Sequence, residues 1–159
     1  MLKVISRMSS CMAYATVANG GISYYPHLVD RVLNQDGSPV RDADGQIAVP
    51  STPKIRADFR TELTAEQIEL VRHGFWEVVN EDGGTGSIAR MENVQVAGKT
   101  GTAQAMLNGK KDTIAWFCCF APYDHPRYTI AVMGAIITTA LLAYACGQKI
   151  GRASCRERV

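Results

Sequence analysis

Within the four residues Lys99-Thr100-Gly101-Thr102, one ammonium group and two hydroxyl groups are suited to binding an anion. Apolar residues precede them, and a second apolar run, Thr113 to Ala121, follows soon after, so the region is predicted to be a strand. Side chains alternate between the two faces of a strand, which puts Lys99 and Gly101 on one face and Thr100 and Thr102 on the other. A glycine within a strand often marks a place where a ligand or another segment approaches the backbone. We therefore predict that this stretch forms one wall of an anion-binding cleft.

The same letters could end a phosphate-binding P-loop, but the rest of that motif is missing. A P-loop requires a glycine five residues before Gly98, and this chain has Asn93 there. The P-loop threonine also opens a helix, whereas Gly101 follows Thr100 at once among β-branched residues. We reject the P-loop interpretation and predict no cofactor.

Metal-binding patterns also fail. The run from Asp42 to Gly45 is similar to part of a calcium loop, but Val40 and Ser51 occupy the first and last liganding positions of that pattern. None of the three histidines is at ligand spacing to another: His27, His73 and His125. We predict no metal site.

Composition indicates one globular domain that has no nucleic-acid partner. The chain has 159 residues, 47% of them hydrophobic, and a net charge of +2. The basic excess lies in residues 151–159, which hold three arginines and one glutamate, and no basic stripe occurs elsewhere. The five cysteines match no zinc or redox pattern. Cys118 and Cys119 are adjacent in an apolar strand, so we expect them to be buried on opposite faces.

The first half of the chain predicts two helices separated by extended structure. Apolar spacing predicts a helix over Val4–Ala18, ended by the glycines that follow it. His27–Leu33 is a short strand candidate, followed by turns at Asp36-Gly37 and Asp44-Gly45. Thr64 and Gln67 form a capping box that opens a second helix. Its expected buried stripe is Ile68, Val71, Phe75, Val78 and Val79.

The second half predicts an antiparallel meander. The strand with Lys99 is followed by strands at Thr113–Phe120 and Arg127–Ile137, with short connections between them. A helix over Thr138–Ile150 would pack on that sheet.

Residues 129–146 carry no charge and reach the lower length limit of a membrane span. Gly134 and the alternation of the first half favour a buried strand plus a buried helix instead. The N-terminus lacks a signal peptide, so we expect the start to be internal to a longer protein.

The nine residues Val96–Gln104, Val-Ala-Gly-Lys-Thr-Gly-Thr-Ala-Gln, resemble the Lys-Thr-Gly element of the serine acyl-transfer enzymes, which include β-lactamases and penicillin-binding proteins. Other segments between about Met8 and Ala135 resemble class B penicillin-binding proteins of the cell-elongation type. They are Ala13–Gly21, Tyr25–Val29, Gly74–Val79, Gly83–Thr85, Ala115–Phe117 and Phe120–Asp124. The resemblance implies an α/β (α+β) fold of the β-lactamase and transpeptidase type, with an antiparallel sheet flanked by helices.

That resemblance also implies an activity, which is peptidoglycan cross-linking by a D,D-transpeptidase. In the family a serine attacks the D-Ala-D-Ala stem peptide, and β-lactams mimic this donor. By resemblance, Lys99 supplies positive potential, while the hydroxyls of Thr100 and Thr102 bind the substrate carboxylate. The Thr102 backbone N–H gives half of the oxyanion hole. Gly101 leaves space for the helix that bears the nucleophile.

The family's other two motifs are missing from these residues. Ser-x-Asn does not occur, and Ser-x-x-Lys occurs only as Ser51-Thr52-Pro53-Lys54. That match contains a proline and follows the helix that it should precede, so we attribute it to chance.

We therefore expect residues 1–150 to be the C-terminal portion of a transpeptidase domain, and residues 151–159 to be a non-native or disordered tail. The missing N-terminal part of the same protein would be the partner, and this chain alone would be inactive. The parent would lie in the cell inner membrane with a periplasmic, extracytoplasmic domain. The alternative is a non-catalytic module of the same fold that binds peptidoglycan or partner proteins.

Overall fold

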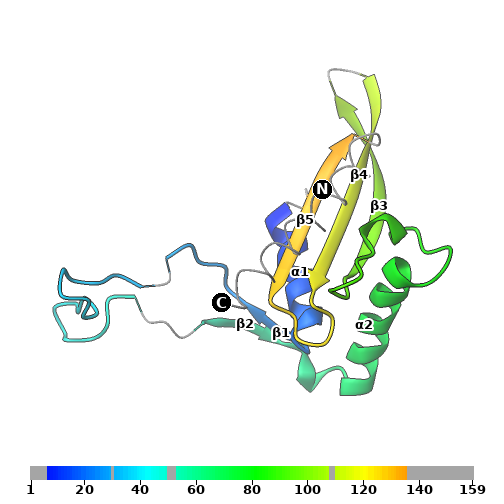
Figure 1. Cartoon of the computed structure of the whole chain (residues 1–159). Coiled ribbons are helices and arrows are strands. Elements are labelled where there is room, and N and C mark those ends of the chain that lie inside the picture. The colour runs from blue at the N-terminus through cyan, green and yellow to red at the C-terminus, as the bar shows by residue number, and fades with distance from the viewer. Residues whose placement is uncertain (1–6, 30, 50–52, 108–109, 136–159) are drawn as a thin grey trace.

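The chain folds into helices and antiparallel strands, as the computed structural model in Figure 1 shows. The structure describes residues 7–29, 31–49, 53–107 and 110–135. Its elements in chain order are α1 (Arg7–Ala18), β1 (Ile22–Tyr24), β2 (Ile55–Asp58), the 3-10 turn η1 (Phe59–Thr61), α2 (Ala65–Asn80), the 3-10 turn η2 (Ser87–Ala89), β3 (Ala97–Leu107), β4 (Lys110–Ala121) and β5 (Tyr128–Ala135). This architecture confirms the predicted α+β fold.

The predicted meander is the three-stranded antiparallel sheet β3-β4-β5. Its register pairs Ala97 with Phe120 at one end of the β3–β4 ladder and Leu107 with Lys110 at the other. Strand β5 continues the sheet by pairing Tyr128 with Ala121. Because the connections are short, each strand lies beside the next one in sequence.

Buried side chains form two clusters on opposite faces of β4. One cluster holds Phe117 and Cys119 together with Val79 of α2 and Ala89 of η2. The other holds Phe120 with Ala97 and Ala18. Cys118 and Cys119 are both buried and lie on opposite faces of the strand, as the sequence predicts. Strand β4 is therefore the centre of the hydrophobic core.

Helix α2 begins at the predicted capping box. The Thr64 hydroxyl accepts a hydrogen bond from the Gln67 amide, and the Gln67 side chain accepts one from the Thr64 amide. The helix lies along β3 and contributes to both clusters, with Val79 in one and Phe75 packed against the other. The expected buried stripe is only partly correct, because Val71 is 46% exposed and faces a groove.

Helix α1 covers the β4–β5 side of the sheet, and Gly20 and Gly21 end it with positive φ angles. A Cβ atom at Gly21 would lie 2.9 Å from the Cδ1 of Ile68, so this glycine lets the chain turn closely against α2. The helix predicted over Val4–Ala18 is confirmed from Arg7 onward. The first three residues of that prediction lie outside the described residues.

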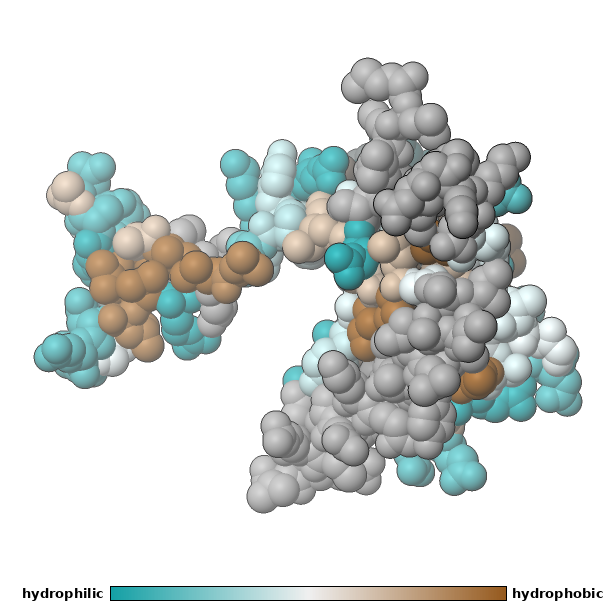
Figure 2. Space-filling model, turned by 90° about the horizontal axis from the view of Figure 1, so that it is seen from above, coloured by the Kyte–Doolittle hydropathy of each residue, from teal (hydrophilic) through white to brown (hydrophobic). Residues whose placement is uncertain are grey.

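The long connection between β1 and β2 projects from the body (Figure 1), and none of its described residues belongs to the core. The strand predicted at His27–Leu33 is wrong for its described residues. Only isolated bridges occur there, such as Leu33 with Pro39 at the predicted Asp36-Gly37 turn. Figure 2 shows hydrophobic side chains gathered on this projection, and the exposed ones are Tyr25, Leu28, Val29, Val32, Leu33 and Ile47. Among the described residues no second segment buries these apolar side chains, and packing of that kind is what stabilises a strand.

The uncharged run 129–146 begins as a strand. Its first part belongs to β5, which confirms the predicted strand; the strand is half-buried rather than buried, and Met133 is 38% exposed. The helix expected at Thr138–Ile150 and the tail 151–159 lie outside the described residues. Among the residues that the structure describes, no helix is long and apolar enough to span a membrane.

The capping box generates a test of local stability. Replacing Thr64 by Ala removes the acceptor for the Gln67 amide, which should cost the first turn of α2 about 1 kcal/mol. We expect amide hydrogen exchange at that turn to become about fivefold faster, a change equivalent to that free energy. Thr64→Ser keeps the acceptor and should exchange like the unmodified chain. Equal protection in the Ala and Ser variants would contradict this role.

Candidate functional site

Strand β3 positions the four residues that the sequence singled out. Lys99 is opposite Cys118 in the β3–β4 register and Gly101 is opposite Trp116, so these four residues share one face of the sheet. Thr100 is opposite Phe117 on the other face. The alternation expected from the sequence is therefore present. The outer edge of β3, which pairs with no other strand in the described part of the chain, borders both faces.

A cleft of about 460 Å³ lies over the Lys99 segment. Strand β3 supplies Lys99 through Ala103, and β4 supplies Trp116 and Cys118. Helix α1 closes the other side with Ser10 and Tyr14. Neither Ser10 nor Tyr14 was expected in a site, because the apolar spacing of their helix indicated only core packing. Ser10 does not open a Ser-x-x-Lys motif, because Ala13 stands three residues later.

Lys99 is the only charged residue among the described residues that line this cleft. Its Nζ donates to the Thr100 carbonyl oxygen at 3.1 Å and makes no ion pair with a described carboxylate. Burial raises the pKa of Tyr14 to about 12, so its phenol is neutral at physiological pH. Burial also raises the pKa of the Cys118 thiol. Within the part of the chain that the structure describes, no lining residue carries a charge opposing this ammonium group, which favours an anionic ligand.

Thr100 and Thr102 differ in how their hydroxyl groups are held. The Thr100 Oγ1 lies 2.8 Å from the Oγ1 of Thr85, in the loop between α2 and η2. Thr102 is exposed, and its hydroxyl has no hydrogen-bond partner among the residues that the structure describes. The contact with Thr85 was not expected from the sequence, since the two threonines are fifteen positions apart.

Two contacts hold the start of β3 in place. The Asn80 side-chain amide donates to the Val96 carbonyl oxygen at 2.9 Å, joining the end of α2 to the strand. The Tyr123 amide donates to the Gln95 carbonyl oxygen at 2.9 Å, joining the β4–β5 turn to the same segment. Side-chain contacts also link that turn to α2, because the Tyr123 hydroxyl donates to Glu69 at 2.6 Å. The chain that leads into Lys99 is thus fixed from both sides.

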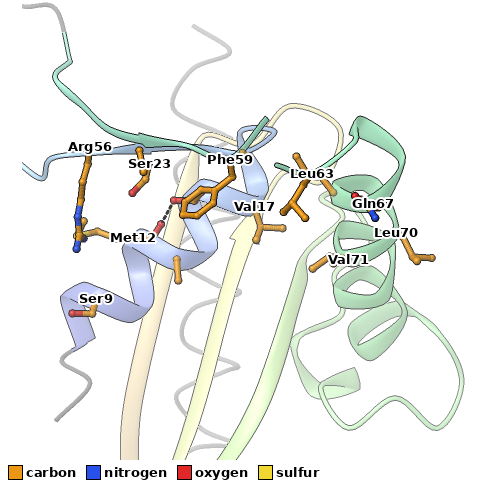
Figure 3. Close-up of a pocket in the computed structure, with 15 residues that line it drawn as sticks. Ser9, Met12, Val17, Ser23, Arg56, Phe59, Leu63, Gln67, Leu70 and Val71 are labelled. Carbon is orange, nitrogen blue, oxygen red and sulfur yellow. Dashed lines mark hydrogen bonds between the residues drawn. The ribbon is translucent and has the colours of Figure 1, made fainter. Parts of the chain in front are cut away.

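A larger cavity of about 750 Å³ lies elsewhere, between α1, α2 and the β1–β2 ribbon. Figure 3 shows Met12 and Val17 of α1 on one side of it, with Leu63 and Val71 toward α2. None of the four predicted site residues lines it. Its walls are mainly apolar, with Arg56 as the charged residue at the β2 end. No group of three metal-ligating side chains occurs here or in any other described part of the molecule.

Solved structures identify the fold as that of a penicillin-binding transpeptidase domain. Penicillin-binding protein 2B from Streptococcus pneumoniae superposes with a TM-score of 0.73 at 20% identity, covering 97% of this chain and 25% of that one. The D,D-transpeptidase domain of a peptidoglycan glycosyltransferase from Eggerthella lenta gives a TM-score of 0.66 at 26% identity, covering 92% and 32% of the two chains.

The sequence supports the same assignment. Residues 4–139 match the family model described as the penicillin binding protein transpeptidase domain, and the chain belongs to this family in its class B form. Among curated relatives, penicillin-binding protein PbpB of Mycolicibacterium smegmatis is 32% identical over 130 residues. Peptidoglycan D,D-transpeptidase MrdA of Haemophilus influenzae is 31% identical over 136 residues. Each match covers 76% of this chain but only 18% and 19% of those relatives, so the chain spans under a fifth of their length.

Two glycines of β3 provide a matched pair of substitutions. A Cβ atom at Gly98 would lie 2.6 Å from the Cys118 carbonyl oxygen and 2.7 Å from the Cys119 Cβ. At Gly101 it would meet only the Trp116 Cβ, at 3.6 Å. Gly98→Ala should therefore destabilise the fold by about 1–3 kcal/mol through overpacking, whereas Gly101→Ala should leave the melting temperature almost unchanged. Thermal unfolding measures both, and equal melting temperatures would contradict the close approach at Gly98.

Proposed function

We propose that this chain forms part of a peptidoglycan-cross-linking D,D-transpeptidase that acts through a serine acyl-enzyme. The observation that carries the proposal is the cleft on β3, where the Lys-Thr-Gly segment forms one wall and Lys99 is the only charged residue among the described ones that line it. Membership of the penicillin-binding transpeptidase family supports the reaction class. The relative named MrdA is described as a peptidoglycan D,D-transpeptidase, and we extend that activity to the parent of this chain.

In this proposal Lys99 attracts the terminal carboxylate of a stem peptide, or that of a β-lactam, by its unopposed charge. The hydroxyl groups of Thr100 and Thr102 donate hydrogen bonds to the same carboxylate. The Thr102 N–H stabilises the oxyanion that forms when a serine attacks the peptide carbonyl, and a second N–H comes from the nucleophile itself. Gly101 leaves room above the strand, consistent with the open space that its missing Cβ leaves.

The serine nucleophile comes from outside these 159 residues in our proposal. No Ser-x-x-Lys occurs here apart from Ser51–Lys54, whose serine lies outside the described residues, and Ser-x-Asn does not occur at all. Residues 1–150 would then be the later part of a transpeptidase domain whose earlier part is its partner, with residues 151–159 outside the fold. The parent would be held at the inner membrane with this domain on the periplasmic side. No cofactor or metal ion enters the reaction.

The class B assignment does not separate an elongation enzyme from other members. Relatives named PbpB and MrdA match at 32% and 31% identity, so the elongation type expected from the sequence stays a prediction.

Labelling with a fluorescent penicillin tests the proposal. The 159-residue chain alone should form no adduct that survives denaturation, whereas the parent protein with its upstream residues should form one per molecule. A stable adduct on the chain alone would overturn the proposal that the nucleophile lies elsewhere. A parent protein that folds but takes up no penicillin would favour the non-catalytic alternative.

Lys99 offers a second test in the parent protein. Lys99→Ala removes the charge of the cleft and should slow acylation by about 100-fold, the lower end of the loss seen when a transition-state donor is removed. Lys99 is exposed, so the melting temperature should stay close to that of the unmodified protein. The rate is measured from a time course of labelling with the same penicillin, stopped at set times. An unchanged rate would argue against a role for Lys99.

A further inference from the structure

The loop that follows α2 brings Thr85 to Thr100 from outside the sheet. The two Oγ1 atoms lie 2.8 Å apart, a normal length for a hydrogen bond between hydroxyl groups. Thr85 is exposed and Thr100 half-buried, so the pair lies at the surface beside the cleft wall. Thr102, on the same face of β3, has no comparable contact within the described residues. The loop therefore singles out one of the two threonines proposed to bind a carboxylate.

Two glycines fix the loop so that Thr85 cannot easily move away. A Cβ atom at Gly84 would lie only 2.3 Å from the Val78 carbonyl oxygen, so the backbone runs directly against the last turn of α2. At Gly86 a Cβ atom would meet the Phe117 ring at 3.3 Å. Phe117 is the register partner of Thr100 on β4, so the loop rests on the residue beside Thr100. Thr85 is held between these two close approaches.

Two backbone hydrogen bonds close the loop. The Gly86 amide donates to the Val78 carbonyl oxygen at 2.9 Å, and the Ser87 amide donates to the Gly84 carbonyl oxygen at 3.1 Å. The residues on both sides of Thr85 are thereby tied by backbone hydrogen bonds. The backbone on either side of Thr85 is thus held in place, and the β-branched side chain has a single torsion, χ1, whose few preferred values restrict the position of the hydroxyl group.

The hydrogen bond between Thr85 and Thr100 can run in either direction, and the ligand decides which hydroxyl donates. Each hydroxyl has one proton to donate and can accept two hydrogen bonds. If Thr85 donates to Thr100, the proton of Thr100 stays available for a carboxylate, and the two bonds reinforce each other along the chain. An anion at Thr100 favours this direction, because it requires a donor and rejects an acceptor.

We propose that Thr85 is a positioning residue, which orients the Thr100 hydroxyl so that it donates to the substrate carboxylate. This inference rests on the proposed function, since it assigns a role within the same site. It differs from a purely structural role for Thr85, in which the hydroxyl only anchors the loop to the sheet. The two roles are separated by substrates with and without a carboxylate.

The experiment uses the parent protein and compares acylation by benzylpenicillin with acylation by its neutral methyl ester. Thr85→Val keeps the shape of the side chain and removes the hydroxyl group. We expect the preference for the carboxylate form to fall about fivefold, the effect of one net hydrogen bond. Thr85→Ser keeps a hydroxyl and should restore the preference. Thr61→Val, the same change at an exposed threonine of η1, is the matched control and should leave it unchanged.

The ratio of the two rates does not depend on how much of the protein is folded, so partial unfolding of a variant cannot imitate the effect. A double-variant cycle adds a second measurement. With Thr100→Val already present there is no hydroxyl to orient, so Thr85→Val should lower the preference no further. An unchanged preference in Thr85→Val, or an equal further loss in the Thr100→Val background, would overturn the inference while leaving the proposed function intact. If neither compound acylates the unmodified parent protein, the proposed function is wrong, and this inference is wrong with it.

Discussion

The pairing of β3 with β4 is the constraint on which the rest of the structure depends. Its register sets Lys99 beside Cys118 and Thr100 beside Phe117, so one ladder decides both the cleft face and the core face of the segment. Phe117 and Phe120 then point to opposite faces of the sheet, and each belongs to the hydrophobic cluster on its own face. A charged residue can stand one position away from the core because side chains on a strand alternate so strictly.

Helix α2 and the β4–β5 turn stabilise this ladder from its ends. Asn80 holds the backbone that leads into β3, and the Tyr123 amide holds the residue before it. Helix α1 lies over Lys99 and lines the cleft with the phenol of Tyr14, which burial keeps neutral, so the helix supplies no counter-ion there. The positive potential of the cleft thus arises from what the fold places around Lys99 as much as from Lys99 itself.

Local signals in the sequence predicted much of this arrangement. The capping box at Thr64, the strand around Lys99 and the meander depend on neighbours close in the chain, so propensity and periodicity were sufficient. Contacts between segments distant in sequence could not be predicted from local propensity and periodicity. Thr85 meets Thr100, and Tyr14 meets the Lys99 cleft, only because the tertiary fold brings them together. Val71 failed as a core residue because helical periodicity indicates an apolar face but not what covers it. His27–Leu33 failed as a strand for the same reason.

The close approach at Gly98 has a consequence for how the sheet selects its pairing. Strand β4 is buried on both faces from Phe117 to Ala121, so its hydrophobic pattern would tolerate a shift of one residue that exchanged the two faces. Such a shift would put Ala97 or Lys99 of β3 in the place of Gly98 opposite Cys119, where a Cβ atom has no room. A residue without a side chain can therefore carry register information that the apolar residues around it cannot. In this molecule that information keeps the ammonium group of Lys99 on the open side of the sheet.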